Sequence, residues 1–199
     1  MKTWLMIVSA IAVSGCMPAQ FEPTDLDVGT LEATESPLIL TSSTAGLTAR
    51  KQEQTMWCWV AVTQAVAESY GISIKQCEIA TLLARDNESD CCVNGGSSAC
   101  NHPGDPDFAL RTAFGIEAKT IGRPLTESEL REQLTLGQPV IVGHNRGKSQ
   151  HLTVINGFDG DKYELLDSDS KSLVYNLTYS ELLNRDGATW FLSTFKFHQ

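Results

Sequence analysis

A cysteine opens an apolar, helix-forming stretch that runs Gln52-Glu-Gln-Thr-Met-Trp-Cys58-Trp-Val-Ala-Val-Thr-Gln-Ala-Val-Ala-Glu-Ser-Tyr70-Gly71. Apolar residues recur in it at spacings of three and four, which predicts a helix from Cys58 to Tyr70 with one apolar face. Gly71 is a natural stop, because glycine readily adopts the left-handed conformation that ends helices. At the helix N-terminus, free N–H groups and the helix dipole favour the thiolate of Cys58, the reactive form of cysteine. The alternative is a buried structural cysteine between two tryptophans.

The six cysteines fall into three groups. Cys16 belongs to the N-terminal segment, and Cys58 stands apart. The other four lie within a span of twenty-four residues: Cys77, Cys91, Cys92 and Cys100. In an oxidising compartment such a cluster forms two disulfides, and a bond between the neighbours Cys91 and Cys92 is geometrically poor. Cys77 is therefore expected to pair with Cys91 or Cys92, and Cys100 with the other; a zinc site that includes His102 is the alternative.

Two histidines compete for the role of a general base beside the cysteine. His144 follows the apolar strand expected at 139–143 and is expected in an exposed loop, whereas His151 opens the β-branched strand expected at 151–158. A strand holds a base more rigidly than a loop, which favours His151.

Asp167 and Asp169 end the next expected strand, and either carboxylate could accept a hydrogen bond from His151. A two-residue turn at Asp159-Gly160 would place both aspartates on the wrong face of the sheet. The sequence therefore predicts a three-residue loop or a β-bulge between the two strands if His151 and an aspartate act together.

The remaining pattern predicts an α+β domain. A helix is expected from Asp105-Pro106 to Phe114, and another after the capping box Thr126-Glu127-Ser128-Glu129. Further strands are expected near 163–167, 172–176 and 189–197. Helices first and an antiparallel sheet afterwards indicate a helical half packed on a sheet half.

The sequence resembles the papain-like cysteine peptidases, because a glutamine lies six residues before a Cys-Trp pair at a helix start. It looks like the bacterial C39-like and AvrRpt2-like (C70) branch in the motif Gln52-x-x-x-Met56-Trp57-Cys58-Trp59, which is followed later by a Cys-Cys pair. The resemblance implies the papain-like fold and a Cys58, His151, Asp167 triad, in which Gln52 supplies an oxyanion-hole amide. His151 matches the family pattern of a histidine leading into an apolar strand, and Asp167 follows at the family's separation, which favours it over Asp169. The resemblance also implies acyl transfer through a thioester on a protein or peptide substrate, with no metal or organic cofactor.

Other functions remain open on the same residues. A transamidase or a cell-wall amidase could use the same Cys, His and Asp in the same order. A non-catalytic surface lipoprotein that keeps the fold for binding is a further alternative, although Gln52, Cys58, His151 and Asp167 are all present.

The N-terminus predicts export. Met1-Lys2 and the short apolar run after it predict a signal peptide over 1–15, because the run is too short to span a bilayer. Val13-Ser-Gly-Cys16 resembles a lipobox, which would make Cys16 the lipidated mature N-terminus. Residues 16–46 are acidic and proline-containing without a regular period, which predicts a flexible tether before a domain at 47–199. The expected location is the outer membrane or the cell surface, with possible release; an ordinary signal peptide is the alternative.

Composition limits the partners. The chain has 199 residues with 42% hydrophobic residues, which fits one globular domain and a tail. Its net charge of -9 argues against nucleic acid and anionic lipid headgroups as partners. The domain is expected to be a monomer.

Overall fold

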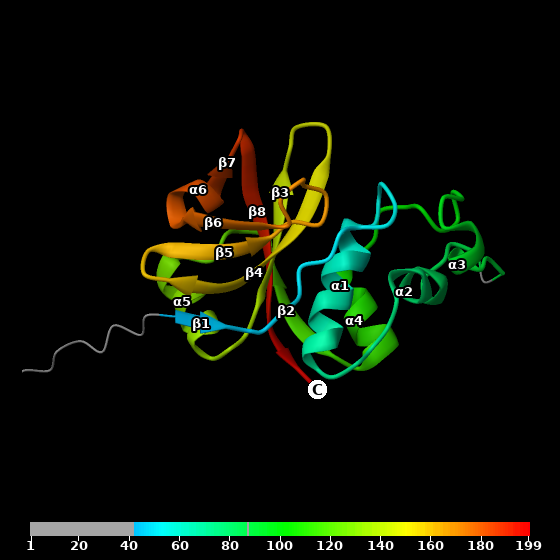
Figure 1. The fold of residues 1–199 in the computed structure, drawn as a ribbon, viewed down its shortest axis with the longest axis horizontal. Coiled ribbons are helices and arrows are strands. Elements are labelled where there is room, and N and C mark those ends of the chain that lie inside the picture. Colours follow the sequence, from blue (N-terminus) through cyan, green and yellow to red (C-terminus); the bar gives the residue numbers. More distant parts are fainter. Residues whose placement is uncertain (1–41, 87) are drawn as a thin grey trace, which may run out of the picture. The chain divides into compact units, whose positions relative to one another are not determined.

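The computed structural model describes residues 42–86 and 88–199, which form one mixed α and β unit (Figure 1). Its helices are α1 (Cys58–Ser69), α2 (Gln76–Leu82), α3 (Cys91–Asn94), α4 (Pro106–Phe114), α5 (Glu127–Thr135) and α6 (Tyr179–Leu183). Its strands are β1 (Ser42–Thr44), β2 (Glu117–Ile121), β3 (Val140–Asn145), β4 (Gln150–Asp159), β5 (Lys162–Leu166), β6 (Val174–Thr178), β7 (Asn184–Arg185) and β8 (Ala188–His198). The predicted α+β class, with a helical part before most of an antiparallel sheet, is confirmed.

The expected capping residues are present at α1, α4 and α5. In α1, every residue from Trp59 to Ala67 is buried, and the chain leaves the helix at Gly71 with a positive φ of 76°. The Asp105 side chain caps α4 by accepting a hydrogen bond from Asp107 N. Thr126 and Glu129 form the expected reciprocal capping box at α5.

The sheet is antiparallel and runs in the order β2-β8-β3-β4-β5-β6. β1 pairs with the far end of β4, at residues 157–159, beyond the part of β4 that pairs with β3. The short β7 pairs with β8. Figure 1 shows α1 and α4 side by side next to the sheet, with α1 starting near the β3–β4 hairpin.

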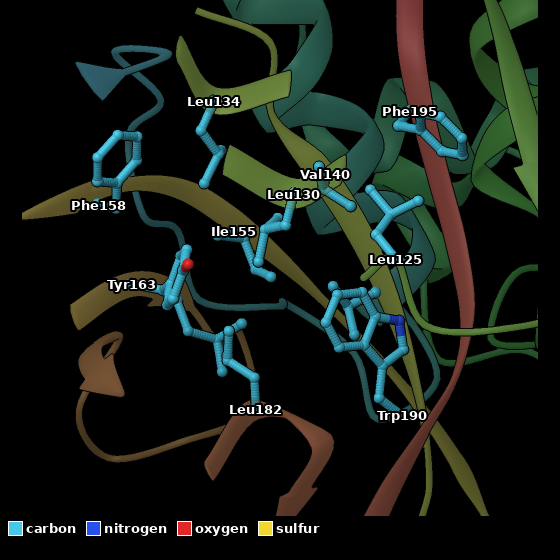
Figure 2. Packing of buried hydrophobic residues seen from close by; sticks show 12 residues of the cluster. Leu125, Leu130, Leu134, Val140, Ile155, Phe158, Tyr163, Leu182, Trp190 and Phe195 are labelled. Carbon is cyan, nitrogen blue, oxygen red and sulfur yellow. The ribbon is translucent and has the colours of Figure 1, made fainter. Parts of the chain in front are cut away.

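Alternation along the strands divides the apolar core between the two faces of the sheet. Val140, Val142 and Ile155 pack in one cluster with leucines of α5 and α6, and Figure 2 shows Ile155 beside Leu130. The other face carries residues from the alternate positions and packs against α1 and α4: Ile141, Val154 and Leu166 with Val62, Ala65, Val66 and Leu110. The packing on this second face holds α1, which begins at Cys58, on the sheet.

A third cluster lies within the helical part, around Trp57, Trp59 and the cysteines. Disulfides join Cys77 to Cys92 and Cys91 to Cys100. This is one of the two expected pairings, and because all four sulfurs are bonded to each other they are not available as zinc ligands.

The irregularity expected between the strands of His151 and Asp167 is present as a β-bulge in β4. β4 and β5 turn through Gly160-Asp161, and the register then shifts between Ile155 and Gly157. Asn156 is the extra residue. The shift moves Val154 opposite Leu166, and continuing this register places Asp167 on the same face as His151.

Three expectations about elements need correction. Ser42–Thr44 form β1, so the folded unit includes residues expected in the 16–46 tether and does not begin at residue 47. β3 extends to Asn145 because it pairs with both β4 and β8, so His144 is a buried strand residue and not part of an exposed loop. The short elements β2, β7, α2, α3 and α6 were not predicted, although the capping box of Thr178 and Glu181 is a local signal for the start of α6.

The expected signal peptide, the expected lipidation of Cys16 and most of the expected tether lie outside the described residues. Within residues 42–86 and 88–199, no helix is long and apolar enough to cross a membrane.

Candidate active site

Cys58 is the first residue of α1, and its side chain is half-buried. It is the one cysteine of the described residues that is not in a disulfide. Trp57 caps the helix without a side-chain hydrogen bond, so the first N–H groups of α1 keep their capacity to stabilise negative charge at the sulfur.

The segment before Cys58 is held by the residues that follow the Cys91–Cys100 bridge. The indole N–H groups of Trp57 and Trp59 donate to the carbonyls of Cys100 and His102, at 2.9 and 2.8 Å. The Asn101 side chain accepts from Met56 N at 2.9 Å and donates to Thr55 Oγ1 at 2.9 Å. The position of the nucleophile therefore depends on the disulfide-bonded part of the helical half.

His151 lies at the start of β4 and is buried. Its Nε2 is 2.7 Å from Oδ1 of Asp167, so Nδ1 is the nitrogen left for Cys58. Burial by itself lowers the pKa of His151, but the hydrogen bond with Asp167, the nearby Cys58 side chain and the negative charge of Asp167 raise it to about 9. The imidazole is therefore charged at neutral pH.

Asp167 follows β5 and is almost fully buried, with 1% of its surface exposed. Burial raises the pKa of this carboxyl group, but hydrogen bonds from His151, the Asp169 backbone and Arg185 outweigh it and hold the pKa well below its usual range. Oδ1 also accepts from Asp169 N at 3.1 Å. The structure thus places Asp167 against the imidazole, whereas Asp169 contributes a backbone N–H and has a largely exposed side chain.

Gln52 is part of the same site, but its amide is already bonded. Its Nε2 donates to the carbonyls of Gln54 and Thr55, at 2.9 and 3.0 Å, and its Oε1 accepts from Ser168 Oγ at 3.1 Å. Both amide hydrogens therefore hold the loop before Cys58 in this conformation. An oxyanion would have to take the place of one of these carbonyls.

His144 lies directly opposite His151 in the β3–β4 register. Its Nε2 donates to the Leu182 carbonyl at 3.2 Å, and burial lowers its pKa, so it is a neutral residue that links β3 to α6. The structure gives it a packing role beside the imidazole of His151.

Two arginines next to Asp167 were not identified as site residues from the sequence. Arg185 Nη1 is 2.9 Å from Oδ2 of Asp167, and Arg146 Nη2 is 3.6 Å from the same oxygen. The one local signal for Arg185 is Asp186-Gly187 directly after it, a dipeptide that favours a two-residue hairpin turn. The contact with Asp167 depends on tertiary structure that no local pattern predicts.

A hollow of about 280 Å³ lies beside the two arginines, lined by His144, Arg146, Arg185, Asp186, Gly187 and Ala188. Within the described ranges, no group of three or more histidine, cysteine or acidic side chains is arranged to hold a metal ion.

Known proteins share this arrangement of helices and sheet. The peptidase domain of Streptococcus ComA, a bifunctional ABC transporter involved in a quorum-sensing pathway, is 23% identical with a TM-score of 0.52, over 74% of this chain and 96% of that one. A putative C39-like peptidase from Bacillus anthracis is 12% identical with a TM-score of 0.52, over 77% of this chain and 96% of that one. At these identities the likeness concerns the fold.

No curated protein matches the chain in sequence. The model of the Peptidase_C39-like family matches residues 46–187, most of the described domain. The chain therefore belongs to the Peptidase_C39-like family and is a cysteine-type peptidase with the papain-like fold.

Proposed function

We propose that the protein is an exported peptidase that hydrolyses peptide bonds with Cys58 as nucleophile, His151 as acid and base, and Asp167 as the residue that orients the imidazole. The observation that carries the proposal is the position of His151. One nitrogen is 2.7 Å from a buried carboxylate, and the imidazole lies close enough to Cys58, the one cysteine outside the disulfides of the described chain, for that side chain to raise its pKa. A thiolate–imidazolium pair at a helix start is an activated nucleophile.

In the proposed reaction, the Cys58 thiolate attacks the carbonyl carbon of a peptide bond and forms a tetrahedral oxyanion. His151 gives its proton to the amide nitrogen, the C–N bond breaks, and the amine leaves a thioester on Cys58. Water then loses a proton to His151 and attacks the thioester. Release of the acid restores the thiolate and the imidazolium.

The backbone N–H of Cys58 is the first donor that we propose for the oxyanion, because it lies at the open N-terminus of α1. Gln52 would be the second, if the oxyanion replaces the Thr55 carbonyl as partner of one amide hydrogen. Catalytic hydrogen bonds often form only once substrate is bound, so the bonds of Gln52 in the free site are compatible with this role.

Export is part of the proposal. Two disulfides within a small domain favour an oxidising compartment, and the apolar run before Cys16 is typical of a lipoprotein signal peptide. We propose that Cys16 carries the lipid and that the following acidic segment holds the domain away from a bacterial outer membrane or cell surface. The likeness to the AvrRpt2-like (C70) branch rests on the sequence alone.

The activity is tested with purified protein lacking residues 1–16, because the described unit begins after them. Hydrolysis of casein and selective modification of Cys58 by iodoacetamide or an E-64-type reagent are expected, with both lost in Cys58→Ala. Asp167→Asn should lower hydrolysis strongly, whereas the matched change Asp169→Asn should lower it far less. Cleavage of peptidoglycan fragments but not casein would favour the amidase, and amine incorporation would favour a transamidase. An unreactive Cys58 with no turnover of any of these would favour the binding lipoprotein and contradict the peptidase.

The anchor is tested in cells with the full chain. Metabolic labelling with palmitate and partition into the detergent phase are expected for the natural sequence and should be lost in Cys16→Ser. Unlabelled protein in the medium from the natural sequence would overturn the anchor and leave the peptidase proposal intact.

A further inference from the structure

We propose that Arg185 is a positioning residue of the active site, which fixes Asp167 so that the carboxylate can orient His151. The inference rests on the proposed function, because it assigns Asp167 as the partner of a catalytic imidazole. It extends the chain of interacting side chains from Cys58, His151 and Asp167 by one member.

The two oxygens of Asp167 face different partners. Oδ1 accepts from Nε2 of His151 at 2.7 Å and from Asp169 N at 3.1 Å, whereas Oδ2 accepts from Nη1 of Arg185 at 2.9 Å. Rotation of the carboxylate would therefore break the bond with Arg185 as well as the one with His151. A charge-assisted hydrogen bond to Oδ2 holds Oδ1 on the imidazole.

Arg185 is itself held from two sides. Its guanidinium lies over the ring of Tyr175 at 4.0 Å, and its side chain is 16% exposed. Its backbone belongs to the β7–β8 hairpin, which turns at Asp186 and Gly187 with positive φ of 52° and 79°. Positive φ at both turn residues is the conformation that Asp-Gly favours in two-residue hairpins. The sequence Arg185-Asp-Gly thus presents the guanidinium from a tight turn.

Arg146 provides the natural comparison. It carries the same charge near Oδ2 of Asp167, but at 3.6 Å, and it also lies 3.6 Å from Oδ2 of Asp169. Its side chain is 37% exposed, more than twice the value for Arg185. If charge alone mattered, the two arginines would contribute similarly. If the directed hydrogen bond matters, Arg185 contributes much more.

The physical need for Arg185 follows from burial. A carboxylate with 1% exposure has lost its water, and it stays ionised only if its oxygens are hydrogen-bonded. Without Arg185, the partner left for Oδ2 is the more exposed Arg146 at 3.6 Å. Protonation of Asp167 then becomes easier, and the orientation of its carboxylate is less defined. The other titratable or charged groups that face this cluster are Cys58 from α1, His144 from β3, Arg146 from the β3–β4 hairpin, Asp169 from the loop after β5, Tyr175 from β6 and Asp186 from the β7–β8 turn.

The test compares Arg185→Met, Arg185→Lys and Arg146→Met in the purified chain. Arg185→Met is expected to lower kcat by about 10- to 100-fold, the range that one charge-assisted hydrogen bond corresponds to, with little change in KM. Its acid limb of kcat should move to higher pH, because Asp167 binds a proton more readily without the guanidinium. Arg185→Lys should recover part of kcat, and Arg146→Met should lose less than Arg185→Met.

Chemical rescue separates positioning from folding. The hollow of about 280 Å³ is lined by Arg185, so added guanidinium ion can enter the space left by Arg185→Met and bond to Asp167. Guanidinium at millimolar concentration, below denaturing levels, is expected to raise kcat of Arg185→Met several-fold and to leave Arg146→Met unchanged. Circular dichroism and thermal unfolding are measured to check that each variant is folded.

The outcomes distinguish the inference from the function on which it rests. Iodoacetamide alkylation of Cys58 against pH is measured in the same proteins and needs no substrate. If the natural chain shows no fast alkylation and no hydrolysis, the proposed function fails. If the natural chain shows both and folded Arg185→Met keeps the same kcat and the same pH profile, Arg185 has no positioning role.

Discussion

Gln52 and Ser168 are joined by two hydrogen bonds, although 116 residues separate them in the chain. The backbone N–H of Gln52 donates to the Ser168 carbonyl at 3.0 Å, and the Ser168 hydroxyl donates to Oε1 of Gln52 at 3.1 Å. The loop that precedes the nucleophile is thereby fastened to the loop that begins at Asp167. Both sides of the proposed catalytic site depend on this connection.

Loss of the Ser168 hydroxyl should loosen this connection without removing it. Ser168→Ala leaves the backbone bond in place, so we expect the free energy of unfolding to fall by about 0.5–1.5 kcal/mol. Gln52→Ala removes three side-chain hydrogen bonds and should lower both stability and kcat by more. Urea denaturation and steady-state kinetics measure the two effects. Equal loss of kcat in the two variants would contradict a separate oxyanion role for Gln52.

The pH dependence of activity should follow His151. Because its pKa is raised to about 9, the imidazolium persists through neutral pH and is lost as the pH rises through about 9. We expect kcat/KM to decline on that basic side. Asp167→Asn should move the decline to lower pH, because it removes the negative charge that stabilises the imidazolium. The measurement is kcat/KM from pH 5 to 10, and a basic limb that does not move in Asp167→Asn would contradict the assignment.

The pH dependence of the unfolding free energy should also reflect the titration of His151. A histidine whose folded pKa lies above its ordinary value of 6.5 stabilises the fold below about 6.5, and this contribution disappears as the pH rises through about 9. The difference in unfolding free energy between the natural chain and His151→Ala should therefore shrink across that interval. Denaturation at several pH values tests it, with His144→Ala as the matched control because the pKa of His144 is lowered instead. A difference that grows with pH would refute the expected sign.

The bulge residue Asn156 should be important for stability. Its Oδ1 accepts from Leu47 N at 3.0 Å, and its Nδ2 donates to Thr44 Oγ1 and Glu164 Oε1, at 3.0 and 2.6 Å. Asn156→Ala leaves the buried N–H of Leu47 without its partner and removes two further hydrogen bonds, and we expect a loss of about 1–3 kcal/mol in unfolding free energy. The exposed Asn176 on β6 is the matched control, with an expected change within about 0.5 kcal/mol. Similar values for the two variants would show that the bulge does not depend on this side chain.

The two disulfides should differ in their effect on activity. Replacing either pair by serine should cost about 2.5–3 kcal/mol, because the closed loops are short and similar in length. Removing Cys91–Cys100 should also lower kcat, because Cys100, Asn101 and His102 hold the segment around Cys58. Removing Cys77–Cys92 should affect kcat much less. Kinetics below the unfolding temperature of each variant make the comparison, and an equal loss of kcat would count against this positioning effect.

Local pattern alone predicted several features correctly. The helix at Cys58, its end at Gly71 and the capping box at Thr126 follow from side-chain chemistry within a few residues, so the sequence was sufficient for them. The requirement for an irregularity between His151 and Asp167 was also predictable, because side chains alternate along a strand with a period of two.

Other features depended on contacts between distant parts of the chain. Pairing with β4 and β8 buried His144, and pairing with β4 made Ser42–Thr44 a strand, since a strand is stabilised by neighbours that its own residues do not specify. The choice between Cys91 and Cys92 as partner of Cys77 was decided by packing around Trp57 and Trp59. By itself, the sequence identified the candidate nucleophile and base through residue type and position, and it narrowed the orienter to Asp167 or Asp169; the resemblance to the papain-like peptidases favoured Asp167. Only the tertiary structure placed Arg185 on Asp167 and engaged the Gln52 amide, because both depend on distances between segments far apart in the chain.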